Sequence, residues 1–222
     1  MIILAHRGLW KYYDEKNSVE AITKAIANGY GVETDIRDRS SELVISHDMP
    51  LDSAPRLREL SKIFSSSKYP IALNIKADGL SKKLLNFISL NSIENYFAFD
   101  MSIPEMYQYN KLGINFFSHV SDICRTPILT DSERCKGLWV DSFSENIWYD
   151  IDEINKLISK YNKNLCFVSE DLHNRDNKTQ WKLIKQVNHN LEKEIILCTD
   201  HPEDAKEFFY EVNYQIKCKV TE

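Results

Sequence analysis

The sequence predicts an α/β fold in which short buried β-strands alternate with amphipathic helices in a single domain spanning residues 1–222. Short apolar runs recur along the chain, and most of them are followed by a segment with helical periodicity. Strands joined through helices favour a parallel sheet, because a parallel return needs a long crossover. No repeat, low-complexity tract or linker interrupts the alternation, and 222 residues suit one domain.

The first strand is expected at residues 2–5, which form an apolar run typical of a buried strand. A polar and aromatic loop leads from it into a helix. Asn17 or Ser18 is suited to cap this helix, and Gly29 is suited to end it. The second strand is expected at residues 31–36.

A further apolar run at residues 43–46 follows a short turn at Ser40. This connection is too short for a parallel return, so we interpret the run as an extra strand outside the regular alternation. A loop with a short helix near residues 57–64 comes next. The third strand of the alternation is then expected at residues 71–75.

The pattern continues with five more strands. Helices are expected near residues 81–89, from Pro104, near 151–160, near 178–187 and after Pro202. The strands are expected near residues 96–99, 114–117, 138–140, 165–168 and 195–198. With the first three, the strands number eight, which closes a (β/α)8 barrel.

The composition is that of a soluble protein, with 43% hydrophobic and 27% charged residues. The net charge of −5 and the lack of an evident basic face argue against nucleic-acid binding. Met1 leads directly into the first strand without a basic segment, and no apolar run reaches the length of a membrane span. We therefore expect a cytoplasmic protein without a membrane span, whose oligomeric state is left open.

The cysteines predict no disulfide framework. They are odd in number, dispersed and without C-x-x-C spacing, which is typical of reduced, buried thiols. They are Cys124, Cys135, Cys166, Cys198 and Cys218.

Polar residues cluster where the early apolar runs end. His6 and Arg7 follow the first strand, and His47 follows the run at residues 43–46. Glu33 and Asp35 are two apart in an extended segment, so both carboxylates point to the same face. Paired carboxylates favour a hard divalent cation, which prefers oxygen ligands. Histidine is suited to general acid–base chemistry near neutral pH.

The order and spacing of four motifs resemble the glycerophosphodiester phosphodiesterase family. The motifs cover most of the first fifty residues, and the resemblance is looser from there to the end. They are His6-Arg7-Gly8, Asn17-Ser18, Glu33-Thr34-Asp35 and His47-Asp48. The resemblance implies a short, divergent member of that family with a (β/α)8 TIM barrel, a divalent metal, a role in lipid metabolism and hydrolysis of a phosphodiester.

The resemblance also implies roles for particular residues. His6 and His47 would be the general acid and base, in an order that is left open. Arg7 and Lys76 would bind the substrate phosphate. Glu33, Asp35 and Asn74 would hold Mg²⁺ or Ca²⁺. Asn74 stands where the family usually has a third acid, so Asp78 or Asp100 is the nearest candidate to supply that charge.

Other polar residues near strand ends have two interpretations each. They are additional site residues, or they are rim carboxylates and helix caps that a strand needs as it leaves the core. Asp100, Asp141 and Glu170 are the possible additional site residues. We interpret His119 and His173 as solvated loop histidines, and Asp200 as a helix cap.

The sequence favours metal-dependent hydrolysis of a phosphodiester similar to a glycerophosphodiester. One alternative is a non-catalytic or repurposed barrel that binds a polyol phosphate, which is suggested by Asn74 and by a short segment at residues 49–68 in place of a glycine-rich one. The other alternative is a lyase that releases a cyclic phosphate. The esterified alcohol and the choice between Mg²⁺ and Ca²⁺ are left open.

Overall fold

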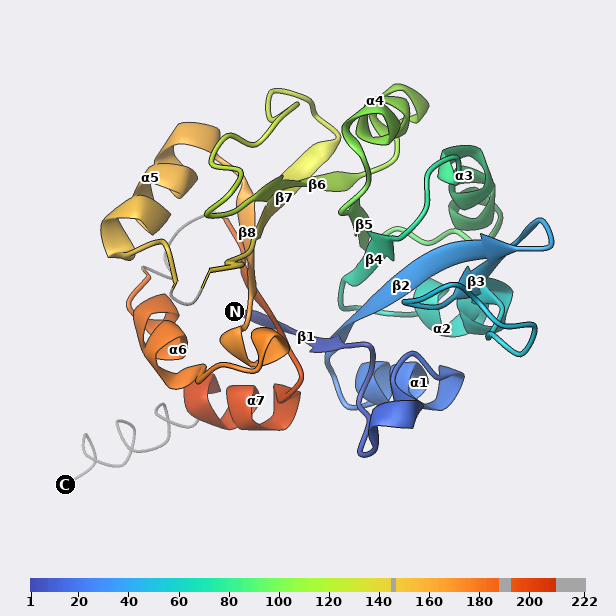
Figure 1. Cartoon of the computed structure of the whole chain (residues 1–222), viewed down its shortest axis with the longest axis horizontal. Coiled ribbons are helices and arrows are strands. Elements are labelled where there is room, and N and C mark those ends of the chain that lie inside the picture. Colours follow the sequence, from blue (N-terminus) through green and yellow to red (C-terminus); the bar gives the residue numbers. More distant parts are fainter. Residues whose placement is uncertain (145–146, 188–192, 211–222) are drawn as a thin grey trace.

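A closed barrel of eight parallel strands forms the centre of the computed structural model, which describes residues 1–144, 147–187 and 193–210 (Figure 1). The strand order around the barrel is β1-β9-β8-β7-β6-β5-β4-β2, and β1 closes the ring by pairing with β2. Helices surround the barrel on the outside, so the predicted (β/α)8 TIM barrel is confirmed. The barrel strands are β1 (Ile2–His6), β2 (Gly31–Arg39), β4 (Ile71–Ile75), β5 (Tyr96–Phe99), β6 (Phe116–Val120), β7 (Cys135–Val140), β8 (Asn164–Val168) and β9 (Ile195–Thr199).

The helices follow the predicted alternation closely. Short 3-10 helices add to them at η1 (Tyr13–Glu15), η2 (Leu57–Leu60) and η3 (Glu170–His173). The α-helices are α1 (Val19–Ala27), α2 (Ser61–Ser65), α3 (Ser81–Leu90), α4 (Ile103–Leu112), α5 (Ile151–Tyr161), α6 (Lys178–Lys185) and α7 (Pro202–Tyr210).

The extra strand β3 (Glu42–Ile45) lies outside the barrel, as its short connection predicts. It pairs antiparallel with the end of β2, with Ile36 opposite Ile45. The third barrel strand is therefore β4, at residues 71–75, in agreement with the sequence. This hairpin brings the residues after Ile45 back to Asp35, because the backbone N–H of Ser46 donates to the carbonyl of Asp35 at 3.1 Å.

Several strand boundaries differ from the prediction: β2 runs on to Arg39, β7 begins already at Cys135, and β6 is shifted along the chain. The strand expected at 114–117 begins at Phe116 and runs to Val120, because the backbone N–H of Ile114 still donates to the carbonyl of Tyr109 at the end of α4. Gly113 makes this tight helix end with a left-handed φ of 78°. As a consequence His119 lies within β6 and not in a loop.

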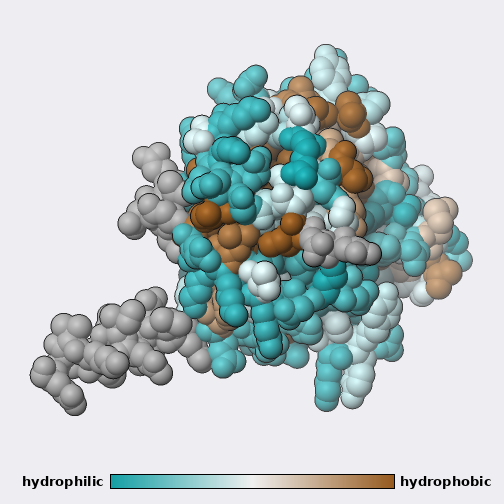
Figure 2. Space-filling model, turned by 60° about the vertical axis from the view of Figure 1, so that its left-hand side comes forward, coloured by the Kyte–Doolittle hydropathy of each residue, from teal (hydrophilic) through white to brown (hydrophobic). Residues whose placement is uncertain are grey.

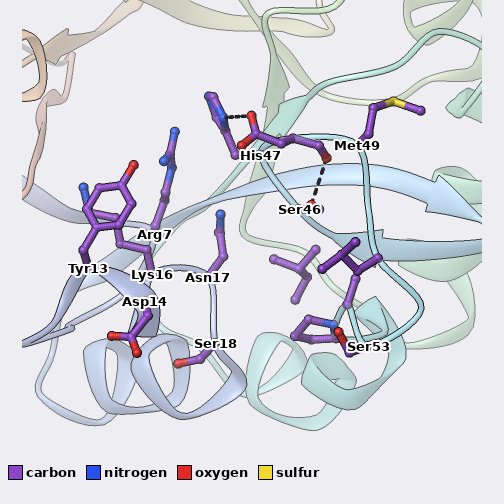
Figure 3. Close-up of a pocket in the computed structure, with 15 residues that line it drawn as sticks. Arg7, Tyr13, Asp14, Lys16, Asn17, Ser18, Ser46, His47, Met49 and Ser53 are labelled. Carbon is purple, nitrogen blue, oxygen red and sulfur yellow. Dashed lines mark hydrogen bonds and ion pairs between the residues drawn. The ribbon is translucent and has the colours of Figure 1, made fainter.

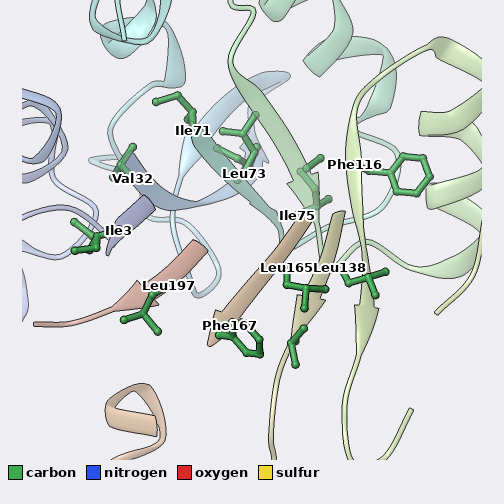
Figure 4. Close-up of a cluster of buried hydrophobic side chains, with 14 of the residues drawn as sticks. Ile3, Val32, Ile71, Leu73, Ile75, Phe116, Leu138, Leu165, Phe167 and Leu197 are labelled. Atoms are coloured by element: carbon green, nitrogen blue, oxygen red, sulfur yellow. The ribbon is translucent and has the colours of Figure 1, made fainter. Parts of the chain in front are cut away.

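Two hydrophobic layers hold the barrel. One layer lies between the strands and the surrounding helices and includes Ile3, Val32 and Leu73 (Figure 4). The other fills the barrel interior, where the rings of Phe97 and Phe117 stack at 3.7 Å. Side chains alternate between the two layers along each strand, so the residues at every second position face the interior.

The interior is packed too tightly to be a channel. The rings of Phe99 and Trp139 also stack, with centroids 3.7 Å apart. A Cβ at Gly137 would lie 2.4 Å from the ring of Phe117, so this position admits only glycine without a shift of that ring. Polar side chains that face inward therefore gather at the carboxyl ends of the strands.

The surface is as polar as the content of 27% charged residues suggests. The face drawn in Figure 2 is mainly hydrophilic, and its hydrophobic residues appear in several separate groups. Within the described residues, none of the helices is both long and apolar enough to cross a membrane. Cys124 is exposed, and Cys135, Cys166 and Cys198 are buried as free thiols. Cys218 lies outside the described residues.

Candidate active site

Three adjacent barrel strands bring most of the predicted site residues together. In the register of β1 against β2, His6 lies opposite Glu33, and in that of β2 against β4, Asp35 lies opposite Asn74. Lys76 directly follows β4, and its backbone N–H donates to the carbonyl of Ile36. Because every second residue of these strands faces the barrel interior, their imidazole, carboxylate and amide groups gather on one side of the barrel mouth.

Glu33 is buried, with a side chain only 1% exposed. Its Oε2 accepts the backbone N–H of Arg7 at 3.2 Å and lies 3.8 Å from His6 Nε2. Burial raises the pKa of Glu33 to about 7, with a further contribution from the charge of Asp35, and the nearby charges of His6 and Arg7 oppose the rise. A cation bound next to Glu33 would therefore stabilise its charged form.

Asp35 is the most heavily paired carboxylate of the site. Its Oδ2 lies 2.9 Å from Arg7 Nε and accepts Asn17 Nδ2 at 2.8 Å, and its Oδ1 lies 3.4 Å from Lys76 Nζ. The amide oxygen of Asn17 in turn accepts the hydroxyl of Thr34 at 2.8 Å. The predicted phosphate ligands Arg7 and Lys76 thus meet at one carboxylate.

The loop between β1 and α1 takes an unusual shape to place these groups. Arg7 and Asn17 have left-handed φ values of 57° and 64°, which are uncommon for residues other than glycine. Gly8, with a φ of +93°, is needed because a Cβ there would lie 2.6 Å from the backbone of Ala21. Ser18 caps α1 by accepting the N–H of Ala21, which leaves Asn17 free to bind Asp35.

Asp200 belongs to the site, although its position before a helix suggests a cap. His6 Nδ1 lies 2.6 Å from Asp200 Oδ1, and Lys16 Nζ donates to Asp200 Oδ2 at 3.0 Å. Burial alone would raise the pKa of Asp200, but the hydrogen bonds and charges of His6 and Lys16 outweigh it and lower that pKa. The helix α7 begins only at Pro202, so the cap interpretation is wrong.

Three buried oxygen atoms near these carboxylates test the fit of a metal. Glu33 Oε1, Asp35 Oδ1 and Asn74 Oδ1 are buried without a hydrogen bond to any of the described residues. Such atoms are rare in folded proteins, and oxygen ligands suit Mg²⁺ and Ca²⁺. The predicted set fits a hard cation through two carboxylates and one amide. The described residues contain no group of three or more His, Cys, Asp or Glu side chains that could hold a metal ion.

The two acids considered as a replacement for the third carboxylate have other partners. Asp78 accepts the hydroxyl of Ser102 at 2.9 Å, where α4 begins. Asp100 Oδ1 lies 3.4 Å from His119 Nδ1. These contacts direct both carboxylates toward other elements, so Asn74 is the residue that β4 supplies next to Asp35.

A pocket of about 410 Å³ opens next to the buried carboxylates (Figure 3). Arg7, Lys16 and Asn17 line it from the loop after β1, and His47 lines it from the loop after β3. His47 is exposed, and its Nδ1 lies 2.9 Å from Oδ1 of Asp48, which is itself 93% exposed. The structure brings His47 to the same pocket as Arg7, while His6 is not among the residues that line this pocket and is held by Asp200.

A second polar group occupies the other side of the mouth. His173 Nε2 lies 2.7 Å from Asp141 Oδ1, and His119 pairs with Asp100. Both histidines are three-quarters buried, so the interpretation of solvated loop histidines is wrong: each is held by a carboxylate from another element. Glu170 pairs with Arg175 Nε at 2.5 Å within one loop, which points to a structural ion pair.

Comparison with known proteins finds similarity in fold and none in sequence families. No family model and no curated protein matches the sequence. The structure is similar to a glycerophosphodiester phosphodiesterase from Agrobacterium tumefaciens, with a TM-score of 0.64 and 15% identity over 96% of this chain and 99% of that one. A glycerophosphoryl diester phosphodiesterase from Parabacteroides distasonis gives a TM-score of 0.66 and 15% identity over 95% of this chain and 86% of that one. Tryptophan synthase from M. tuberculosis gives a TM-score of 0.56 and 11% identity over 93% of this chain and 86% of that one.

Proposed function

We propose that this protein is a metal-dependent phosphodiesterase that acts at the pocket beside Glu33 and Asp35. The main support for the proposal is that potential metal ligands, cationic side chains and a histidine lie close together. Buried oxygens without hydrogen bonds lie next to two cations and a histidine held by a carboxylate. The fold that this protein shares with two phosphodiesterases supports the same function.

Arg7, Lys16 and Lys76 are suited to bind the phosphate. Arg7 uses Nε on Asp35, and its guanidinium has further N–H donors that match phosphate oxygens. Lys16 lines the pocket, and its Nζ lies 4.3 Å from the ring centroid of Trp10, a contact that fixes its position. These local cations attract an anion despite the net charge of −5.

Glu33, Asp35 and Asn74 would hold Mg²⁺ or Ca²⁺, which when bound withdraws charge from a non-bridging phosphate oxygen. The remaining contributions come from the chain itself. Arg7 and Lys76 neutralise charge that develops on the phosphate as the bond to the leaving alcohol breaks. The barrel interior is filled by buried apolar side chains, among them stacked aromatic rings, which excludes water from the interior.

His6 and His47 would move the protons. Asp200 holds His6 at Nδ1, so Nε2 is the nitrogen left to exchange a proton with the substrate. His47 lines the pocket from the loop after β3 and would supply the second group that exchanges a proton. One of them accepts the proton of the attacking hydroxyl, and the other donates a proton to the leaving alkoxide.

A turnover screen tests the proposal. Purified protein is treated with a chelator and assayed on chemically diverse phosphodiesters with and without added Mg²⁺ or Ca²⁺, beside an Asp35→Asn control. We expect turnover that needs the cation and that the control lacks. Full activity without a cation would remove the metal from the mechanism. Binding without turnover of any phosphodiester would favour a repurposed barrel, and a cyclic phosphate as the final product would favour a lyase.

A further inference from the structure

The pocket beside His47 has two unlike walls. The wall formed by the loop after β1 is polar and carries Arg7 and Lys16 (Figure 3). The opposite wall, formed by residues 49–55 after β3, presents Met49, Leu51 and Pro55. A ligand that fills this pocket therefore meets cations at one end and hydrocarbon at the other.

The apolar wall is exposed to an unusual degree. Met49 is 80% and Leu51 is 73% exposed, although both are large apolar side chains. Tyr13, on the facing rim, is 76% exposed. A single exposed leucine needs no explanation. Three large apolar side chains around one pocket that also contains phosphate-binding cations form a binding feature.

The segment that carries this wall is held firmly in place. Arg39 donates from Nη1 to the carbonyl of Pro50 at 2.6 Å, and its Nε lies 2.6 Å from Asp52 Oδ1. At the other end of the segment, the N–H of Ile45 donates to the carbonyl of Pro55 at 2.9 Å. The Arg39 side chain and the backbone of β3 thus hold the backbone of this segment in place before a ligand arrives, which lowers the entropic cost of binding.

We propose that this wall binds a hydrocarbon chain of the substrate, whose phosphate lies at Arg7 and Lys16. The substrate class is then a phosphodiester lipid with one chain, a lysophospholipid in chemical terms. This inference rests on the proposed phosphodiesterase function and specifies the alcohol. The volume of about 410 Å³ lies at the lower end of ligand pockets, roughly 300–1,000 Å³, which suits one chain bound as a monomer.

A chain-length series tests the inference. The substrates are glycerophosphocholine and the hexanoyl, octanoyl and decanoyl lysophosphatidylcholines, each kept below its micelle concentration with saturating Mg²⁺ or Ca²⁺. We expect kcat/KM to rise with chain length by up to about fourfold for each methylene that the wall buries. Met49→Ser and Leu51→Ser should each lower the ratio of kcat/KM for the octanoyl substrate to that for glycerophosphocholine by at least about fourfold.

Leu90→Ser is the matched control. Leu90 is 75% exposed, like Leu51, but lies on α3 beside a different pocket, so its replacement should leave the ratio unchanged. Circular dichroism and thermal unfolding of each variant confirm that it folds. A flat chain-length series, or a ratio that Met49→Ser and Leu51→Ser leave unchanged, overturns the chain site. So does an effect of these variants that occurs only on micelles or vesicles, because it indicates surface docking. Absence of turnover on every phosphodiester refutes the proposed function itself.

Discussion

Replacing Glu33 by glutamine removes a charge that the fold does not favour and keeps the size of the side chain. The folded protein raises the pKa of Glu33 from an ordinary value of 4.5 to about 7, because the carboxyl is buried and lies near Asp35. Each pKa unit corresponds to about 1.4 kcal/mol, so the difference is worth about 3 kcal/mol in the free energy of unfolding.

The sign of this effect follows from proton binding. Between pH 4.5 and about 7, the folded protein keeps a proton on Glu33 that the unfolded chain has lost. The stability that this proton provides is fully present below pH 4.5 and is lost as the pH rises through about 7. Glutamine does not titrate. Relative to the natural protein, Glu33→Gln should therefore gain about 3 kcal/mol between pH 5 and pH 8.

Urea unfolding at the two pH values, with chelator present, measures this difference. Ser18→Ala is the control: it removes the cap of α1, so it should cost about 1 kcal/mol equally at both pH values. An equal effect of Glu33→Gln at pH 5 and pH 8 would refute the reasoning, because it would mean that Glu33 is charged in the folded protein without penalty. Added Mg²⁺ at pH 8 should stabilise the natural protein more than the variant, if the cation takes the place of the proton.

Three further predictions concern turnover and metal affinity. His6→Ala and His47→Ala should each lose roughly 10²–10⁴-fold in kcat on a substrate with a poor leaving group, and a near-normal rate in either variant would show that its histidine is misassigned. Asn74→Asp should tighten Mg²⁺ binding in calorimetry, because it adds a carboxylate to the site; unchanged or weaker binding would point to a different third ligand. Asp200→Asn should lower kcat by at least about tenfold with little change in KM, since it loosens His6; a change in KM alone would argue against that role.

The sequence predicts the part of the site that neighbouring strands build. His6, Glu33, Asp35 and Asn74 can be placed together because β1, β2 and β4 follow one another and the inward face repeats at every second residue. The extra strand β3 is also predictable, because a turn of a few residues does not allow a parallel return. These are local rules, so they hold without knowledge of the tertiary structure.

The contacts that the sequence does not reveal depend on the pairing of distant strands or on the packing of loops. Asp200 reaches His6 across 194 positions, through the pairing of β9 with β1 that closes the barrel. Without knowledge that β9 pairs with β1, the sequence around Asp200 looks the same as that of a cap for the following helix. Asn17 and Ser18 are both good caps, and only the packing of the loop after β1 assigns Asn17 to Asp35. A ring of eight strands offers one signal for such cases: polar residues that end the last strand face those that end the first.

The ion pairs around Asp35 connect the two parts of the proposed site. Arg7 and Lys76 contact this carboxylate, and both are also suited to bind the substrate phosphate. A cation bound by Glu33 and Asp35 would compete with them for its oxygens, which makes their charges available to a phosphate. A phosphate bound by Arg7 and Lys76 would in turn leave Asp35 without its present partners and favour a cation there. Because such coupling is reciprocal, the cation and the substrate should each strengthen the binding of the other.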